Sequence, residues 1–313
     1  MKKFASLILA AMMLLALTAC GQKQASSQDT APLTQEKTQT ETAAADNAGA
    51  AAAPAQETPK QYSFQVSSYK VKDDRYSDDK SALLASSEYE IPKVTPLHAN
   101  GTPFDMTAEA NTPEAAAAAA INQYFADWLA KEQEWFEEVV QMARKDYADN
   151  GAQPYSLWQS SSYYYADTMG FNSWQNDKLL CIVMESYNFT GGVHGYSGKT
   201  AVIFDLATGK VMTPGELVSD FSGMTNAVTQ EILRQIQNGD LAAQYGMDAY
   251  FDDYKETVND WMERAVSFDD TGMNVVFAVY DITPYAHGEQ SFHISYDILS
   301  PYLNATGHEM LGI

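Results

Sequence analysis

The sequence predicts an α+β protein, in which strands pair mostly antiparallel and amphipathic helices bury one face. Two strongly apolar runs, residues 179–187 and 199–206, have the length of buried strands and flank a glycine-rich connection. Three longer segments instead repeat apolar residues at the 3.6-residue spacing of a helix. Both patterns occur after residue 60, so about 250 residues remain for one large domain or two smaller ones that share a core.

In the first half of this region, alternation of Tyr62, Phe64 and Val66 predicts a strand over residues 62–71. Residues 89–94 also look extended, and Thr112 followed by Pro113 predicts the start of a helix that continues to about Tyr147. The apolar stripe along this helix is expected to face the core: Ile121, Phe125, Trp128, Leu129, Trp135, Phe136, Val139, Val140 and Ala143.

The second half predicts a further extended segment over residues 155–166, and then the two apolar strands. Their connection, Asn188 to Gly195, has three glycines in five residues, which favours positive φ and a tight turn between antiparallel strands. The remaining elements are a turn at 207–210, helices at 225–237 and 248–265, a hairpin from Phe268 through 269–272 into 275–280, and a last strand at 292–296.

The first 19 residues predict a lipoprotein signal peptide. Lys2 and Lys3 precede an apolar run, residues 4–16, that is too short to span a bilayer. Leu17-Thr18-Ala19-Cys20-Gly21 matches a bacterial lipobox, so we expect cleavage before Cys20 and lipidation of its sulfur, with palmitate-type acyl chains as the membrane anchor. The protein is therefore expected on the extracytoplasmic face of a membrane of the bacterial cell envelope.

Residues 20–60 are expected to be a disordered tether, because Ala, Gln, Thr, Ser and Pro dominate and almost no large apolar side chain is present. Beyond it we expect two α+β modules, at 61–178 and 179–313. The only other cysteine, Cys181, lies inside an apolar strand, so no disulfide is predicted and the thiol is expected to be buried and inert.

The formal charge of −22 becomes −24 on cleavage, because residues 1–19 carry two lysines and no acid. This excess repels phosphate and anionic lipid, so no nucleic acid is expected as a partner and contact with the membrane is expected only through Cys20. Cationic proteins, peptides or metal ions are attracted instead, although the charge also serves solubility. Acidic pairs such as Asp252-Asp253 lack the ligand spacing of a calcium loop.

Three motifs in one order carry a resemblance to a known family. They are Thr190–Gly195, then Phe204–Leu206 with Thr208–Lys210, then Tyr280–Ile282 with Pro284–Ala286 and Gly288. Together they resemble the paired extracytoplasmic domains of RsiV-type anti-sigma factors and of the N-terminal part of some peptidoglycan deacetylases. The resemblance implies an α+β fold with helices packed on one face of a mostly antiparallel sheet, in a short N-terminal and a larger C-terminal module.

One member type of that family senses host lysozyme by binding it directly. This chain shows neither an anti-sigma segment before a membrane span nor a deacetylase domain, so we expect ligand binding rather than signalling by cleavage. The expected partner is a lysozyme or another cationic muramidase. The candidate contact residues lie in the glycine turn and in a second loop: Gly191, Gly192, His194, Gly195, Pro284, Tyr285 and His287.

Two alternatives stay open. Trp158, Tyr163, Tyr164 and Tyr165 would suit a peptidoglycan- or glycan-binding module that stacks on sugar faces. His194, with His287 and His293, would suit a metal-dependent cell-wall enzyme, although no zinc-binding, nucleophile-elbow or phosphate-loop motif is present. No catalytic residue, metal site or cofactor is therefore assigned, and an enzyme is the less favoured interpretation.

Overall fold

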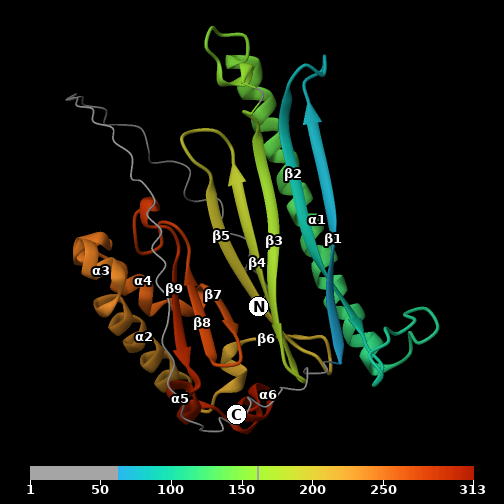
Figure 1. The fold of residues 1–313 in the computed structure, drawn as a ribbon, viewed down its shortest axis with the longest axis vertical. Helices are drawn as coiled ribbons and strands as arrows, with labels where there is room; N and C mark the ends of the chain where they lie inside the picture. The colour runs from blue at the N-terminus through green and yellow to red at the C-terminus, as the bar shows by residue number, and fades with distance from the viewer. Residues whose placement is uncertain (1–62, 161) are drawn as a thin grey trace, which may run out of the picture. The chain divides into compact units, whose positions relative to one another are not determined.

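The computed structural model of the chain describes residues 63–160 and 162–313. The predictions for the signal peptide, Cys20 and the tether lie outside these residues. The described part is α+β, as the sequence predicts (Figure 1). No helix in it is both long and apolar enough to cross a membrane.

Six strands form the larger sheet, in their order along the chain, and every neighbouring pair is antiparallel except β2 with β3. The strands are β1 (Phe64–Tyr76), β2 (Leu83–Pro96), β3 (Tyr165–Gln175), β4 (Leu179–Phe189), β5 (Tyr196–Asp205) and β6 (Val211–Met212). The expected boundary between modules, after residue 178, falls in the short turn between β3 and β4 of this one sheet.

The parallel step from β2 to β3 requires a long crossover, and helix α1 (Pro113–Asn150) supplies it. The Thr112 side chain caps this helix by accepting a hydrogen bond from the Ala115 amide at 3.2 Å, and Pro113 occupies its first turn. Ile121, Phe125 and Val139 are buried against the sheet, so the predicted core-facing stripe is confirmed.

Strand β4 is apolar on both faces because it lies between two cores. Leu180 and Ile182 pack with α1, whereas Leu179 and Cys181 join the core of the second sheet. Successive side chains of a strand point to opposite faces, so a strand covered on both sides reads as one continuous apolar run.

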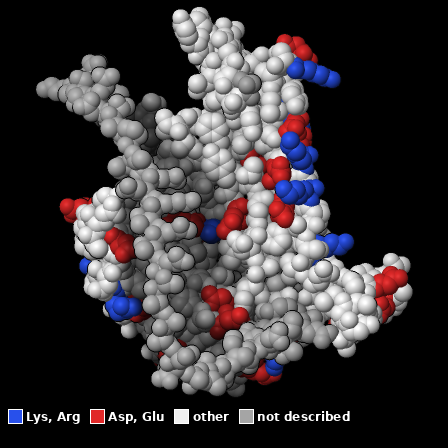
Figure 2. Space-filling view, viewed as in Figure 1, with Lys and Arg blue, Asp and Glu red and all other residues white. Residues whose placement is uncertain are grey.

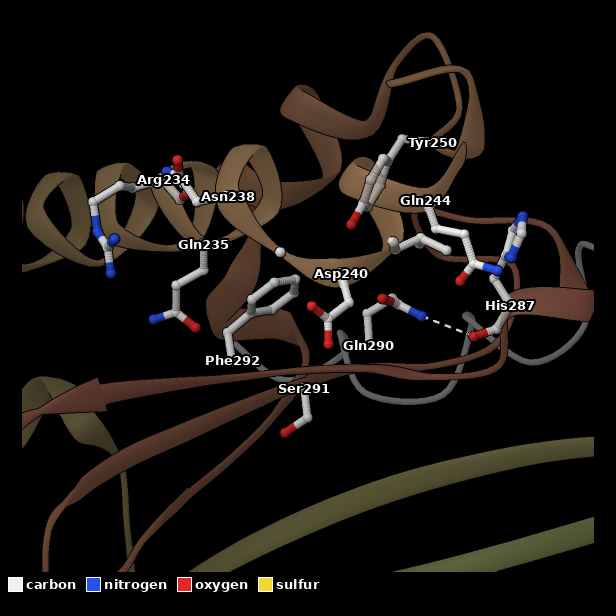
Figure 3. Close-up of a pocket in the computed structure, with 12 residues that line it drawn as sticks. Arg234, Gln235, Asn238, Asp240, Gln244, Tyr250, His287, Gln290, Ser291 and Phe292 are labelled. Carbon is white, nitrogen blue, oxygen red and sulfur yellow. Dashed lines mark hydrogen bonds between the residues drawn. The ribbon is translucent and has the colours of Figure 1, made fainter. Parts of the chain in front are cut away.

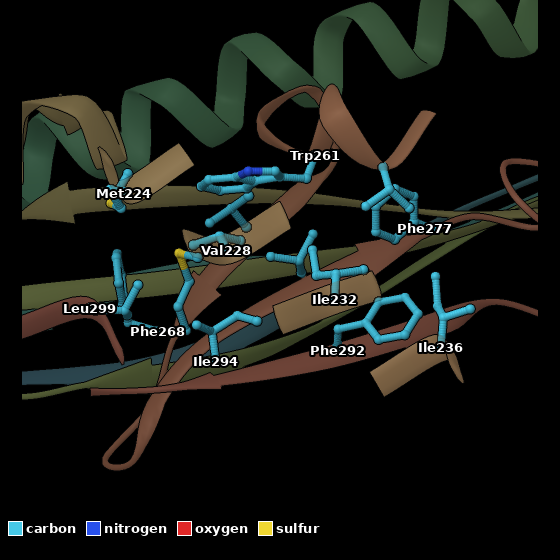
Figure 4. Close-up of a cluster of buried hydrophobic side chains, with 14 of the residues drawn as sticks. Met224, Val228, Ile232, Ile236, Trp261, Phe268, Phe277, Phe292, Ile294 and Leu299 are labelled. Carbon is cyan, nitrogen blue, oxygen red and sulfur yellow. The ribbon is translucent and has the colours of Figure 1, made fainter. Parts of the chain in front are cut away.

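The second sheet has three antiparallel strands, β7 (Ala265–Phe268), β8 (Gly272–Phe277) and β9 (Gln290–Ser295). Side chains of Val228, Ile232 and Ile236 on helix α2 (Phe221–Asn238) pack onto it, together with Trp261, which is fully buried (Figure 4). The shorter helices are α3 (Asp240–Tyr245), α4 (Tyr254–Asn259), α5 (Tyr296–Leu299) and α6 (Ala305–Leu311).

Three sequence predictions are wrong in extent. The strand expected over 275–280 ends at Phe277, because the Asp281 carboxylate accepts from the Ala278 amide and closes a turn there. The expected strand over 155–166 begins only at Tyr165, because Trp158 and Tyr163 pack against one another rather than pair with a neighbouring strand. The expected helix over 248–265 is broken, because the Phe251 amide donates to the Ile282 carbonyl and draws the backbone away from a helical path. Only α4 and single 3-10 turns remain there.

Candidate functional site

The connection between β4 and β5 is a glycine-rich loop with an exposed apolar tip. Gly191 and Gly192 have φ of 97° and 89°, as the sequence predicts. Gly195 has ordinary φ, but a Cβ there would lie 2.4 Å from the Tyr187 ring, so its lack of a side chain serves close packing instead. Val193 stands at the tip and is 96% exposed.

His194 joins this loop to two tyrosines that follow it by more than 80 residues. Its ring stacks on Tyr285, with centroids 3.8 Å apart and planes 14° from parallel. Its Nδ1 lies 3.0 Å from the Gly195 carbonyl oxygen, which only accepts, so Nδ1 carries the proton. Its Nε2 lies 3.1 Å from the Tyr280 hydroxyl and forms a second hydrogen bond there.

We call Val193, His194, Tyr280 and Tyr285 the paired-loop surface. Tyr280 is 48% exposed and has φ of 70°, a left-handed conformation that is unfavourable for a bulky residue. The turn that imposes it is closed by the Asp281 carboxylate, which accepts from the Ala278 amide at 2.8 Å. Strained backbone that carries an exposed aromatic is typical of functional loops.

An ion-pair triad fixes the second loop to the larger sheet. Lys199 Nζ on β5 lies 2.6 Å from Glu289 Oε1 and 3.1 Å from Glu185 Oε1 on β4. Burial opposes the charged form of Lys199, but its hydrogen bonds with Glu289 and Glu185 outweigh that effect and raise its pKa. The loop that carries Tyr285 is thereby held near His194.

Negative charge is unevenly distributed. Along β1 and β2 basic and acidic side chains alternate (Figure 2), and they pair, as in Lys70 with Glu88 at 2.8 Å. Residues 240–263 instead hold seven acidic residues against one lysine, a formal charge of −6, and all seven acids are exposed. Sequence reasoning singled out only Asp252 and Asp253 in this stretch, although the charge count alone marks it.

Residues 217–297 match the family model described as "Protein of unknown function (DUF3298)". The chain contains a DUF3298 domain. Tyr280, Pro284, Tyr285 and His287 belong to it, whereas the glycine turn precedes it in the sequence. The DUF3298 domain covers the whole second sheet and the helices α2 to α4.

A solved structure of a DUF3298 protein resembles this chain in fold. A member from Bacteroides fragilis is 16% identical, with a TM-score of 0.52, and the similarity covers 80% of this chain and 96% of that one. A family protein from Pseudomonas aeruginosa is also 16% identical, with a TM-score of 0.48 and coverage of 77% and 95%. No curated protein matches the sequence.

The other candidate residues in the DUF3298 domain, Pro284, His287 and His293, are not part of the paired-loop surface. Pro284 precedes a 3-10 helix, Tyr285–His287. The His287 ring centroid lies 5.2 Å from that of Tyr245, and His287 lines a cavity that none of the paired-loop residues border. His293 bonds to Asn274 Oδ1 at 3.1 Å. The three histidines therefore have separate partners, and within residues 63–160 and 162–313 no group of three or more His, Cys, Asp or Glu is placed to hold a metal ion.

The aromatic segment before β3 is part of the core. Trp158 and Tyr165 are 7% and 6% exposed and stack with centroids 5.8 Å apart, while Tyr163 meets Trp158 edge-on. The Trp158 Nε1 donates to Asp146 at 3.0 Å. Trp158 and Tyr165 therefore offer no open face to a sugar ring, whereas Tyr163 and Tyr164 are half-buried.

Cys181 is free and buried, and burial raises its pKa to about 12. A thiol with so high a pKa carries almost no thiolate at neutral pH, which argues against a nucleophilic role.

Proposed function

We propose that this protein is a lipid-anchored, extracytoplasmic binding protein whose partner is a lysozyme or another cationic muramidase, and that the paired-loop surface makes the central contact. The observation that carries the proposal is the combination at one place of an exposed apolar tip, Val193, and aromatic side chains fixed by mutual stacking. Binding energy at interfaces concentrates in aromatic anchors of this kind.

Charge supports the same partner. A chain at −22, with seven exposed acids between residues 240 and 263, attracts a basic protein and speeds its encounter more than it tightens the final complex. The resemblance of the three sequence motifs to RsiV-type sensor domains points to the same class of ligand. Under this proposal the lipid on Cys20 and the tether to residue 60 hold the binding domain near the cell wall, where muramidases act.

The alternatives have weaker support. A glycan-binding module would need exposed stacking platforms, and Trp158 and Tyr165 are packed inside. A metal-dependent enzyme using His194 would need a free ring nitrogen, but Nδ1 and Nε2 are both engaged, with Gly195 and Tyr280.

The test is a matched pair of variants titrated with a basic lysozyme in 0.15 M salt, with the full chain in detergent. Val193→Lys places a cation at the loop tip, while Val211→Lys makes the same change at another exposed valine on β6. Val211 pairs with Phe204, at the other end of β5, about 25 Å from the loop.

Both variants alter net charge equally, so long-range steering is matched and only the local contact differs. We expect Val193→Lys to weaken binding at least tenfold and Val211→Lys to change it by less than threefold. Equal effects of the two variants would place the contact elsewhere. Absence of saturable binding by the unmodified chain would refute the proposal, and binding of chitin oligosaccharides instead would favour the glycan alternative.

A further inference from the structure

A second site lies in the DUF3298 domain between α2, α3 and β9 (Figure 3). It is a cavity of about 650 Å³. The C-terminal end of α2 contributes Gln235 and Asn238, α3 contributes Asp240 and Gln244, and β9 contributes Gln290 and Phe292. No candidate of the sequence analysis except His287 borders it.

Each side-chain amide that lines the cavity donates a hydrogen bond from its nitrogen to another group of the protein. Gln235 Nε2 donates to the His293 carbonyl at 2.7 Å, and Asn238 Nδ2 donates to the Arg234 carbonyl at 2.7 Å. Gln244 Nε2 donates to the Tyr245 hydroxyl at 3.0 Å, and Gln290 Nε2 donates to the His287 carbonyl at 2.9 Å, the bond drawn in Figure 3. These bonds fix the amides and leave their oxygens as acceptors.

Two further groups lack a partner. The Tyr250 side chain is only 7% exposed, its hydroxyl points toward the cavity (Figure 3), and it makes no hydrogen bond with the described part of the chain. Asp240 is exposed and forms no ion pair with any described residue. Among the described residues, the Tyr250 hydroxyl is not one of the fully buried polar atoms without a partner, so its oxygen is open to the cavity and available to a ligand there.

The charge of the cavity is negative. Arg234 also lines it, but its guanidinium is held by Glu231 through two bonds of 2.7 Å, so this pair is neutral. Asp240 is then the one uncompensated charge among the lining residues, all of which are described. Leu241, Phe292 and the Tyr250 ring add apolar wall suited to methylene groups.

We propose that this cavity binds a primary alkylammonium group. An ammonium offers three donors and no acceptor, which complements amide oxygens, a hydroxyl and a carboxylate, and its alkyl chain fits the apolar wall. The group has two possible sources, a free alkyl diamine or the side chain of a lysine presented by a protein. The site is separate from the paired-loop surface, so this inference does not depend on the proposed function.

The experiment is calorimetric titration of the full chain, in detergent and 0.15 M salt, with four probes. They are 1,5-diaminopentane, N-acetyl-lysine methylamide, the uncharged analogue 1,5-pentanediol and chitotriose. We expect saturable one-to-one binding of at least one ammonium probe and none of pentanediol. Preference for the diamine would identify a free amine as the ligand, and preference for the lysine derivative would identify a protein side chain.

Asp240→Asn and Asp248→Asn form the matched pair of variants. Each removes one exposed acid from residues 240–263, but only Asp240 lines the cavity. We expect Asp240→Asn to weaken ammonium binding at least tenfold, Asp248→Asn less than twofold, and Tyr250→Phe about threefold or more. Equal weakening by the two acid variants, stronger binding of chitotriose than of either ammonium probe, or no saturable binding would overturn the proposal. Val193→Lys should leave diamine binding unchanged, so failure here is distinguishable from failure of the muramidase proposal.

Discussion

Replacing Glu132 by glutamine should stabilise the folded protein above pH 7 and change its stability little at pH 4. Glu132 is half-buried on α1, near the buried Asp167 of β3, whose carboxylate accepts a hydrogen bond from Tyr89 at 2.7 Å. Burial, and then repulsion from Asp167, raise the pKa of Glu132 to about 7, although a hydrogen bond with Trp128 opposes the change.

The direction follows from proton binding in the two states. Between about pH 4.5 and pH 7 the unfolded carboxyl is ionised while the folded one keeps its proton, so the free energy of unfolding falls as pH rises through this range. Above pH 7 the Glu132 carboxyl is ionised in both states, and the folded state keeps the full destabilisation that comes from burying this charge. Asp167 acts in the same direction because burial raises its pKa too.

The magnitude follows from the size of the pKa change. At about 1.4 kcal/mol for each tenfold change in ionisation, a rise from 4.5 to about 7 corresponds to at most about 3.5 kcal/mol. Glu132 is partly exposed, and solvent screening reduces this to about 1–2 kcal/mol. Carboxyls with lowered pKa, such as Asp74 and Asp269, lose stabilisation only below their usual titration range, so they do not mask the effect.

The assay is urea unfolding followed by circular dichroism at pH 4, 5, 6, 7 and 8. Glu132→Gln should raise the free energy of unfolding by about 1–2 kcal/mol at pH 8 and should flatten its dependence on pH between 5 and 8. Glu138→Gln, at an exposed position of the same helix, makes the same change of charge and is the control. A neutral or destabilising effect of Glu132→Gln at pH 8, or the same effect in the control variant, would contradict this prediction.

Three further predictions follow from single positions. Gly209→Ala should lower the free energy of unfolding by about 2 kcal/mol or more, because φ is 69° and the new Cβ would lie 2.3 Å from the Ala117 carbonyl oxygen of α1. Gly192→Ala has the same backbone strain but open space around the new Cβ, so it should lower the free energy of unfolding by only about 1 kcal/mol. Thermal unfolding of the two variants measures the difference. Cys181 should resist a thiol reagent in the folded chain and react at once in urea, as absorbance would record. Cys20→Ser should abolish incorporation of labelled palmitate and move the protein from the membrane fraction to the soluble one; retention in the membrane would contradict the lipobox assignment.

Local features of the fold could be predicted from the sequence because short-range geometry determines them. The apolar run at Leu179, the cap at Thr112 and positive φ at Gly191 each depend on a few neighbouring residues. The expected helix over 248–265 failed for the opposite reason. Its stripe of Tyr254, Val258 and Trp261 is buried as predicted, but a hydrogen bond to the distant Ile282 carbonyl breaks the backbone between its turns.

The sites were only partly predictable. His194 and Tyr285 were each singled out as loop residues, yet their stacking joins two loops about 90 residues apart in sequence and depends on how the two sheets pack. Of the residues that line the cavity beside β9, the sequence singled out only His287. Gln235, Asn238 and Gln290 are common polar residues without a motif, and each amide nitrogen finds its backbone carbonyl only in the folded chain.

Ring stacking within the protein distinguishes the paired-loop surface from other exposed aromatics. An interface loses about 0.5–1.5 kcal/mol for each flexible side chain that it orders. His194 and Tyr285 are already stacked, and Ile282 and Thr283, just before the second loop, are fully buried, so little ordering remains for a partner to impose. Tyr155, at 98% exposed, makes no ring contact within the described residues and would have to be immobilised on binding. A preorganised surface with less aromatic area is therefore the better candidate for tight binding than the most exposed tyrosine in the described structure.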